Sequence, residues 1–397
     1  MIQTDNKSLC CGCETCGLVC PKNCISFEKD ALGHKYPHVD KSVCINCKKC
    51  ENVCPIQKEF AESNIGLEAW VAYSTDRKIR ARGSSGGIFE TVASWIIDDG
   101  GIVFASKFDE NLKLKCVEAK TIDEIKFLTK SKYLQSDCSS AFPIMKRYVE
   151  DGKKMLFVST PCQIAAFKSY LGNFANKENV YLMDFFCHGV PSQDFFDRCR
   201  IYVEQKKRIS IKNYEFRSKI NNGKTPHYYT MTYEKNGKEK KKTQLYFFDP
   251  FYFAFQKYIS LRDCCYICPY AKGNHAGDLT IGDFHEIERY IHGINRFEGV
   301  STVLINNEKG FSVWKNVKNG LNVHNIDIQM LQRDKQIYSG GSKEPQNRKS
   351  FLVDLQSGKD FNSIIKKWFN GDKEYKRRIY YRLPDFLRNK LKKIIGI

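Results

Sequence analysis

The stretch CCGCETCGLVCP at residues 10–21 has the spacing C-x2-C-x2-C-x3-C-P, and CINCKKCENVCP at residues 44–55 repeats it. The two stretches contain most of the cysteines in the first part of the chain. Ten of the 18 cysteines of this 397-residue protein come before residue 55. This clustering predicts a small module built around cysteine, over residues 1–62, joined to a larger domain of ordinary composition.

Whether dense cysteines bind metal or form disulfides depends on the redox state of the compartment. The N-terminus lacks the basic start and apolar run of a signal peptide, and no stretch reaches roughly 18 uninterrupted apolar residues. We therefore expect a cytoplasmic protein, where dense cysteine indicates metal binding more often than disulfides. A content of 42% hydrophobic and 13% aromatic residues is ample for a buried core, which excludes wholesale disorder.

The repeated spacing is that of a bacterial ferredoxin with two [4Fe-4S] clusters. Three closely spaced thiolates wrap one cluster, and the fourth, expected at the start of a short helix, ligates the other. This crossed pattern assigns the first cluster to Cys10, Cys13, Cys16 and Cys54, and the second to Cys44, Cys47, Cys50 and Cys20. The alternative, a pair of structural zinc knuckles, usually has two C-x2-C pairs across a longer gap. Cys11 and Cys24 lie outside the pattern and are interpreted as small buried hydrophobic residues.

From residue 67 onward the pattern changes to alternating strands and helices. One amphipathic helix is expected to end at Gly100 and another to cover residues 139–150. Strands are predicted at 69–74, 102–105, 155–158 and 180–186. Such strand–turn–helix units indicate an α/β sheet with helices on its faces, here over residues 67–365. Binding sites in such sheets lie beyond the carboxyl ends of the strands.

Three unusual turns fall at those ends. Ser84-Ser85-Gly86-Gly87 opens a helix, where N–H groups and hydroxyls suit a phosphate or a flavin edge. The alternative is an ordinary serine cap with a glycine turn. The other two turns, TPCQ at 160–163 and FCHGVP at 186–191, each contribute a cysteine. Together with a C-x2-C pair they suggest a third cluster on Cys162, Cys187, Cys265 and Cys268, although distant single cysteines are usually buried thiols.

Several enzyme classes have no support in the sequence. There is no G-x-G-x-x-G fingerprint and no Walker lysine motif, so a standard NAD fold or a P-loop enzyme is not indicated. There is no G-x-S-x-G elbow for Ser-His-Asp hydrolysis. His188 is a candidate proton donor, but a lone histidine beside a glycine turn is more often structural, and the catalytic residues remain unknown.

The order of the motifs resembles a known family. A double-cluster ferredoxin followed by SSGG, TPCQ, CHGVPS, LRDCCYICPYA and GDLTIGDF is similar to the beta-subunit family of coenzyme F(420)-reducing hydrogenase and dehydrogenase. The resemblance runs from about Ser8 to about Lys367. The matching positions are Gly86 and Gly87, Cys162, Cys187, Cys265 and Cys268, and the segments Gly277-Asp278 and Gly282-Asp283-Phe284.

The resemblance implies FAD and an additional [4Fe-4S] cluster. The residues expected to bind the flavin are Ser84, Ser85, Gly86, Gly87, Gln163 and Asp283. A flavin suits a ferredoxin module because it accepts electrons singly and delivers them as a pair. Cations from Arg80, Arg82 or Lys132 would favour its reduced form, although each is more simply a surface cation. The fold class expected is an α+β ferredoxin-like module joined to an α/β flavin-binding domain with a mixed sheet.

The function that follows is an iron–sulfur flavoprotein oxidoreductase. It would pass electrons between the ferredoxin-type clusters and FAD, and then to coenzyme F(420) or another organic metabolite. Its partners would be a redox protein or small electron carrier and a small-molecule substrate. The alternative is a non-catalytic electron-transfer subunit of a larger hydrogenase or dehydrogenase complex.

The net charge of +19 is unevenly distributed. Residues 366–397 hold eleven Lys or Arg and three acids. Phe386, Leu387, Leu391, Ile394 and Ile395 recur there at helical spacing. This basic tail suits docking to an anionic membrane or a partner, or packing on its own domain. The basic run at 238–242 is predicted to be a solvated turn in a polar hairpin-like segment between Thr230 and Gln244. The aromatic run at 246–255 is predicted to be core or a lid over a planar cofactor. Residues 1–60 have eight Lys or Arg against seven acids and no nucleic-acid motif, so nucleic-acid binding is not expected.

Overall fold

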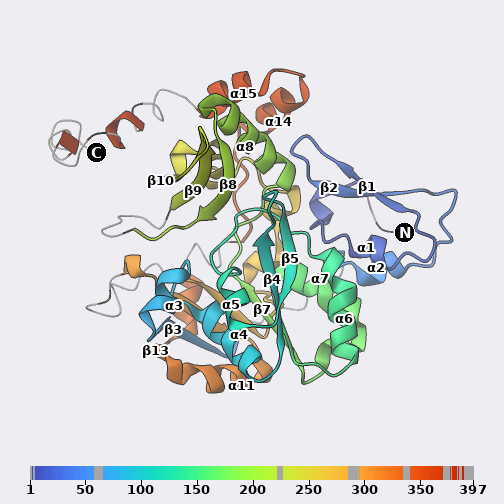
Figure 1. Ribbon diagram of the computed structural model, residues 1–397. Coiled ribbons are helices and arrows are strands. Elements are labelled where there is room, and N and C mark those ends of the chain that lie inside the picture. The colour runs from blue at the N-terminus through green and yellow to red at the C-terminus, as the bar shows by residue number, and fades with distance from the viewer. Residues whose placement is uncertain are drawn as a thin grey trace.

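The computed structural model describes residues 5–57, 66–220, 227–284, 296–333 and 340–369, with a few isolated positions outside these ranges. Its strands form sheets of two, three and eight strands. Figure 1 shows the N-terminal segment, in blue, projecting to one side of the larger body.

The N-terminal module, residues 5–57, is a strand hairpin with two short helices. β1 (Ile25–Lys29) and β2 (Lys35–Val39) pair antiparallel, and each four-cysteine motif passes through one helix, α1 (Thr15–Leu18) or α2 (Lys49–Val53). Cys20 and Cys54 follow the ends of these helices, so the expectation that the fourth thiolate opens a helix is wrong. The module has little apolar core besides its cysteines, which is typical of small domains that depend on a metal group for stability.

The eight-stranded sheet is mixed, as the sequence predicts. β4, β6, β7 and β11 run parallel, and antiparallel strands flank them on both sides. All four predicted strands are present, with ends within three residues of those expected. The spatial order is β13 (Leu321–Ile326), β3 (Glu68–Ser74), β12 (Ser301–Ile305), β11 (Leu279–Asp283), β7 (Val180–Phe185), β6 (Met155–Val158), β4 (Ile102–Phe108) and β5 (Leu114–Ala119).

Helices cover both faces of this sheet because its central strands are apolar on both sides. In β4, Val103 and Ala105 face one core and Ile102 and Phe104 face the other, as the alternation of a strand requires. Each fully buried Val, Ile or Phe contributes about 1.5–3 kcal/mol. The first core is covered by α4 (Ile88–Asp98), α5 (Ile122–Lys126) and α11 (Glu308–Val317), and the second by α6 (Phe142–Glu150) and α7 (Pro161–Leu171). α3 (Arg77–Arg82) and α12 (Ile328–Arg333) contact β3.

A second body, which the sequence does not predict, packs beside this sheet (Figure 1). Its aromatic core contains most of the 246–255 run, so that run is core. The basic run 238–242 lies in a strand and not in a turn, because the two-residue turn Asn236-Gly237 before it has positive φ at both positions. The elements are α8 (Gln193–Lys207), β8 (Ser210–Phe216), β9 (Tyr228–Lys235), β10 (Lys238–Leu245), α9 (Pro250–Gln256), α14 (Arg348–Gln356) and α15 (Phe361–Phe369).

The predicted basic tail starts inside α15. Ile364, Ile365 and Phe369 of this helix are buried in the aromatic core, and Lys367 Nζ donates to Asp354 Oδ2 at 2.5 Å. The start of the tail therefore packs on its own domain. Nearly all of the proposed amphipathic segment lies outside the described residues, which include only Leu387 and Arg388 of it. None of the helices in the described ranges is long and apolar enough to cross a membrane.

Candidate functional site

A cavity of about 280 Å³ lies at the carboxyl ends of the parallel strands, close to the lower end of the roughly 300–1,000 Å³ typical of ligand pockets. β6 leads into the TPCQ turn, β7 into the CHGVP turn, and β11 ends at Asp283. β3 runs in the same direction, because β12 is antiparallel to both β3 and β11. The SSGG turn that follows β3 and α3 therefore reaches the same edge, and all three predicted turns line one cavity.

The SSGG turn is held in place by the backbone around it. The Ser85 hydroxyl donates to Val300 O at 2.7 Å, and the Ser84 hydroxyl accepts from Ser131 N at 2.7 Å. Gly86 is not among the lining residues; a Cβ there would lie 2.4 Å from Ala72 O. Gly87, with φ of 91°, is the N-cap of α4 and leaves its first turn without a side-chain cap. The predicted serine cap is therefore absent, and the first turn of α4 faces the cavity.

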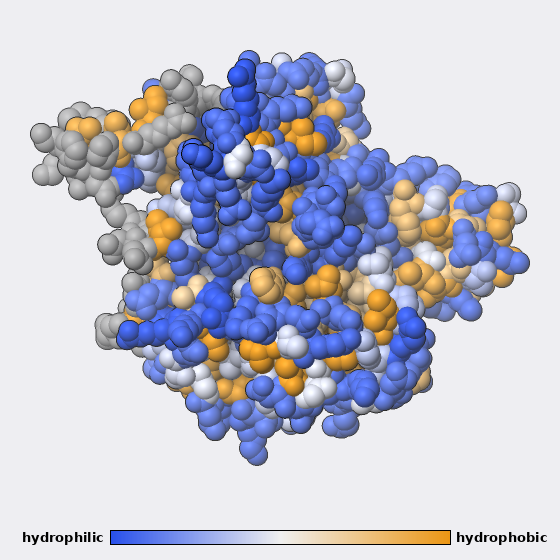
Figure 2. Space-filling view, in the orientation of Figure 1, coloured by the Kyte–Doolittle hydropathy of each residue, from blue (hydrophilic) through white to orange (hydrophobic). Residues whose placement is uncertain are grey.

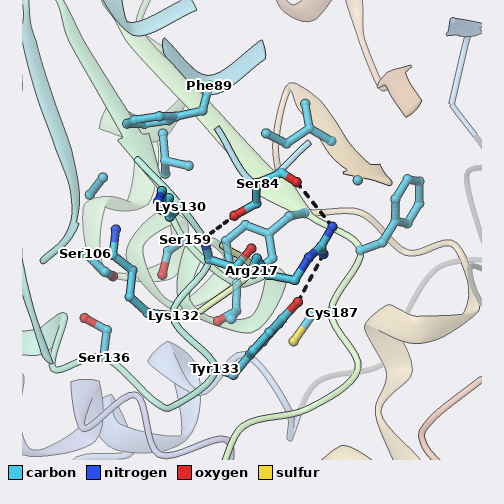
Figure 3. Close-up of a pocket in the computed structure, with 18 of the residues that line it drawn as sticks. Ser84, Phe89, Ser106, Lys130, Lys132, Tyr133, Ser136, Ser159, Cys187 and Arg217 are labelled. Atoms are coloured by element: carbon cyan, nitrogen blue, oxygen red, sulfur yellow. Dashed lines mark hydrogen bonds between the residues drawn. The ribbon is translucent and has the colours of Figure 1, made fainter. Parts of the chain in front are cut away.

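Arg217 and Asp283 form a two-armed ion pair beside this turn. Arg217 Nη1 donates to Asp283 Oδ2 at 2.6 Å, and Nη2 donates to Oδ1 at 3.0 Å. The same guanidinium donates to the Tyr133 hydroxyl at 3.1 Å and to Ser84 O at 3.3 Å (Figure 3). Burial opposes the charge, but the Asp283 carboxylate keeps the pKa of Arg217 well above its usual value. Asp283 thus fixes an arginine that ties the SSGG turn to β11.

Lysines line the cavity beside the SSGG turn, on either side of Ser131 in the chain. Lys132 Nζ donates to the carbonyls of Leu128 and Thr129, each at 2.7 Å. Burial, and then the neighbouring Lys130, lowers the pKa of Lys132 to about 7. Of the three cations predicted near a flavin only Lys132 lines the cavity, because Arg80 and Arg82 pair with Glu298 and Glu90.

Gln163 is a polar group that the protein itself leaves unsatisfied. It lies in the first turn of α7, is only 4% exposed and lines the cavity. Its Oε1 atom has no hydrogen-bond partner among the described residues. A buried polar atom without a partner is costly. This atom therefore indicates a site that a polar ligand completes.

A smaller cavity of about 40 Å³ adjoins the first and is lined by thiols. Gly189 N donates to Cys187 Sγ at 3.4 Å. Gly189 has φ of 110°, and a Cβ there would lie 2.9 Å from Cys265 Cβ, so glycine permits the close approach of the two loops. Burial, followed by Cys265 and Cys162, raises the pKa of Cys187 well above its usual value. The lining cysteines are Cys11, Cys162, Cys187, Cys264, Cys265 and Cys268.

The two cavities share a wall. Cys11, Thr160, Cys162, Cys187 and His188 line both of them. His188 therefore lies at the junction, and Ser342 donates to its carbonyl. A group held by the thiols and a group held in the larger cavity would therefore be neighbours.

The ferredoxin-type thiols gather in the crossed arrangement that the spacing suggests. A cavity of about 20 Å³ is lined by Cys20, Cys24, Cys44, Cys47 and Cys50. In the other group, burial and then the charges of Cys13, Cys10 and Cys54 raise the pKa of Cys16. Within the described residues, no group of three or more His, Cys, Asp or Glu side chains is arranged for a single metal ion. A [4Fe-4S] cluster keeps its thiolates farther apart, because irons and sulfides lie between them.

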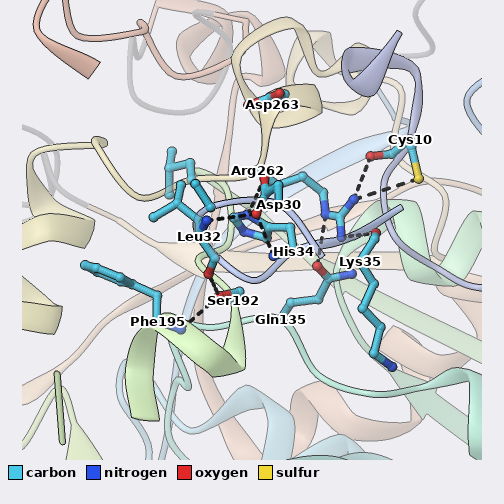
Figure 4. A network of polar contacts seen from close by, with 12 residues as sticks. Cys10, Asp30, Leu32, His34, Lys35, Gln135, Ser192, Phe195, Arg262 and Asp263 are labelled. Carbon is cyan, nitrogen blue, oxygen red and sulfur yellow. Dashed lines mark hydrogen bonds and ion pairs between the residues drawn. The ribbon is translucent and has the colours of Figure 1, made fainter. Parts of the chain in front are cut away.

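Arg262 joins the N-terminal module to the body (Figure 4). It is 1% exposed, and its guanidinium donates to Cys10 O at 3.2 Å, Lys35 O at 2.8 Å and Gln135 Oε1 at 3.0 Å. Nη1 also lies 3.8 Å from Cys10 Sγ. Gln135 in turn donates to Gly12 O at 2.7 Å. The loop of the first cysteine group is thus held by an arginine three residues before Cys265.

The structure brings most of the predicted site residues together. Apart from Gly86, the predicted flavin contacts line the larger cavity, and the four cysteines of the predicted third cluster line the smaller one. The sequence analysis missed Arg217, Tyr133, Gln135 and Arg262, and it read Cys11 as a core residue only. The LRDCC motif contains Arg262, but no local pattern distinguishes Arg217 from a surface arginine.

Comparison with known proteins supports the resemblance. Residues 152–329 match the family model for the C terminus of the coenzyme F(420) hydrogenase/dehydrogenase beta subunit. Over this segment, which is less than half of the chain, the sequence is similar to that family. The segment includes the TPCQ, CHGVP, C-x2-C and paired GD motifs of this beta-subunit domain, whereas the SSGG turn and the ferredoxin-type motifs precede it.

A solved structure of the F(420)-reducing [NiFe] hydrogenase complex from Methanosarcina barkeri, prepared with xenon, contains a chain that aligns at 19% identity with a TM-score of 0.44. The alignment covers 80% of this chain and 97% of that one. No curated protein matches the chain.

Proposed function

We propose that this protein is an iron–sulfur flavoprotein oxidoreductase with three [4Fe-4S] clusters and one FAD. The observation that carries the proposal is the wall shared by the thiol cavity and the larger cavity. Electron transfer requires cofactors to lie close together, and the shared lining residues mean that the two cavities are adjacent. The family of residues 152–329 supports electron-transfer chemistry of the oxidoreductase type.

The three thiol groups follow one another toward the larger cavity. The second ferredoxin-type group lies around the exposed Cys47, and the first group lies against the body through Arg262. Cys11 comes next: hydrogen bonds with Cys13 and Cys162 raise the pKa of its buried thiol. Cys11 therefore bridges the first group and the thiol cavity.

The larger cavity offers the contacts that FAD needs. The first turn of α4 and the SSGG backbone suit phosphate oxygens, and Gln163 Oε1 suits a ring N–H. Lys132, when protonated, would supply positive charge at the wall, which favours an anionic reduced ring, whereas the charge of Arg217 is matched by Asp283. FAD would supply the conversion between single electrons and a hydride. The residues proposed to hold it are Ser84, Ser85, Gly87, Gln163 and Asp283, with Gly86 shaping the turn from behind.

We further propose a small organic hydride acceptor as the substrate, with coenzyme F(420) as the candidate that the family description suggests. The protein would work in the cytoplasm with a redox partner. A non-catalytic electron-transfer subunit is the alternative, and it would hold the clusters without a flavin.

Anaerobic reconstitution tests the proposal through the amounts of iron, sulfide and flavin bound. We expect about 12 iron and one flavin per chain, four iron for each cluster. About eight iron without flavin would leave only the ferredoxin-type clusters and overturn the oxidoreductase assignment. Reduction of the bound flavin by dithionite, followed by its oxidation with coenzyme F(420), tests the substrate separately.

The third cluster has its own test. Cys265→Ala removes one thiol of the smaller cavity, and we expect the iron content to fall by about four while the ferredoxin-type signals remain. Cys199→Ala is the matched control, because Cys199 is a buried thiol in the aromatic core of the second body. Unchanged iron in Cys265→Ala, or an equal loss in Cys199→Ala, would show that these cysteines do not hold a cluster.

A further inference from the structure

We propose that the surface around the second cysteine group docks a small acidic electron-carrier protein. This docking face consists of Lys22, Lys41, Lys48 and Lys49 with Val43 and Ile45 among them. The proposal rests on the function above, because it needs a cluster at that group. It adds the place where electrons are exchanged and the charge of the partner.

The face lies directly over the second thiol cavity. Lys22, Ile45, Lys48 and Lys49 line that cavity together with Cys20, Cys44, Cys47 and Cys50. Cys47 is itself exposed. A partner seated on these side chains would be separated from the thiol group by one layer of atoms. In contrast, the first cysteine group is enclosed between the module and the body, where Arg262 and Tyr270 contact it.

The charged side chains of the N-terminal module are unevenly distributed, with an excess of lysines at the docking face. Away from the face, Lys35 pairs with Glu14 at 3.0 Å and Lys29 with Asp194 at 2.8 Å, and Lys7 lies over the Tyr36 ring. Among the described residues, the four lysines of the docking face have no acidic partner. Two acids lie within two residues of these lysines. Asp40 precedes Lys41 and accepts from the backbone and hydroxyl of Ser42, and Glu51 follows Lys49 in α2. With four lysines against these two acids, the face is positive although residues 1–60 are almost neutral.

Apolar side chains complete the face. Ile45 is 57% exposed and Val43 46% exposed, between Lys41 and Lys48 in the chain. Figure 2 shows hydrophobic residues among hydrophilic ones on the projecting N-terminal part. A small apolar centre with a charged rim is typical of weak redox encounters, which bury less than about 1,200 Å². Opposite charge steers such encounters and raises their rate, so the fitting partner is an acidic one-electron carrier.

Charge reversal tests the face. The variant carries Lys22→Glu, Lys48→Glu and Lys49→Glu, and the matched control carries Lys238→Glu, Lys240→Glu and Lys241→Glu on the exposed strand β10. Both lose the same charge. Stopped-flow absorbance would measure how fast a reduced acidic [2Fe-2S] ferredoxin reduces the reconstituted protein at low salt. We expect the rate to fall at least tenfold in the first variant and less than twofold in the control.

Chemical reduction with dithionite distinguishes a failure of the docking face from a failure of the iron–sulfur function on which it rests. If dithionite fails to reduce the wild-type protein, the iron–sulfur function is wrong. If dithionite reduces both variants normally but the ferredoxin rate falls equally in both, or in neither, the docking face is wrong. If the triple variant loses iron, the double variant Lys48→Gln with Lys49→Gln makes the same test with a smaller change in charge. For this variant we expect the rate of reduction by ferredoxin to fall at least threefold. Binding of this face to anionic lipid vesicles with no effect on the ferredoxin rate would also overturn the proposal.

Discussion

Arg262→Ala is the substitution that the structure predicts most sharply. The side chain is almost fully buried and contacts two separate segments of the N-terminal module. Alanine removes its donors to Cys10 O, Lys35 O and Gln135 Oε1. It also removes the cation above the Tyr36 ring, whose centroid lies 4.6 Å from the guanidinium carbon.

The expected effect can be worked from these contacts. Gln135 belongs to the body, so the hydrogen bonds that hold the module are those to Cys10 O and Lys35 O. At about 1.5 kcal/mol each, the lower end of the range for a charged donor, they contribute about 3 kcal/mol, and the cation above the Tyr36 ring adds about 1 kcal/mol. Because these acceptors stay buried when Arg262 is lost, water does not readily take the place of the guanidinium. We expect the free energy for opening the module from the body to fall by about 4 kcal/mol, which corresponds to roughly a thousandfold in the opening equilibrium.

Hydrogen–deuterium exchange on the whole reconstituted chain measures this opening. Amides of residues 5–57 are expected to exchange roughly a thousandfold faster in Arg262→Ala, while those of β4, β6 and β7 keep their wild-type rates. Arg198→Ala is the control, because Arg198 reaches the same module through one hydrogen bond, to Ala31 O at 3.0 Å. That single bond predicts an effect of about tenfold. Exchange within tenfold of wild type in Arg262→Ala, or an effect no larger than in Arg198→Ala, would refute the reasoning.

Three further outcomes concern the larger cavity. The pKa of Lys132 is lowered to about 7 in the folded protein, so between about pH 7 and 10 the unfolded chain binds more protons at this residue. The free energy of unfolding therefore rises with pH, by up to about 1.4 kcal/mol per pH unit. Lys132→Met should flatten this rise, as measured by denaturant titrations at pH 7 and 9. Asp283→Asn leaves the Arg217 charge buried without its carboxylate and should cost about 3–5 kcal/mol in urea unfolding, whereas Asp278→Asn is expected to spare that pair. Gln163→Leu should leave unfolding stability unchanged or higher, because the buried oxygen has no protein partner among the described residues, yet weaken FAD binding about tenfold in a fluorescence titration.

The sequence predicts best what is encoded locally. The four-cysteine motifs need only short loops to gather their thiols, and their spacing anticipates the groups of the N-terminal module. The apolar stretches of β3, β4, β6 and β7 predict strands, since each is followed by a turn and a helix. Once those strands are parallel, their turns must meet at one edge. That inference brings Cys162 and Cys187 together without any knowledge of the packing.

Residues that act through long-range contacts escape such analysis. Arg217 pairs with Asp283 across 66 positions, and Arg262 reaches Cys10 across 252. Arg217 has no periodic or motif signal, and the LRDCC motif that contains Arg262 does not show which distant residues its side chain contacts. The three-stranded sheet was missed for a related reason: β10 is almost entirely charged, and its pairing with β9 is set by the Asn236-Gly237 turn more than by apolar alternation.

The N-terminal module is distinct in sequence from the larger domain, but Cys11 shows that the two pack as one unit. It belongs to the ferredoxin-type loop, yet its side chain packs with Phe104 and Phe157 in the core of the large sheet and lines both cavities of the body. Gly12 beside it has φ of 69°, and a Cβ there would lie 2.3 Å from the Arg262 guanidinium. The loop that gathers the first cysteine group is therefore shaped by the body, and the wall of the body's cavities is completed by the loop. A module joined only by a linker would leave that wall open, so we infer that the two parts reach their functional geometry together.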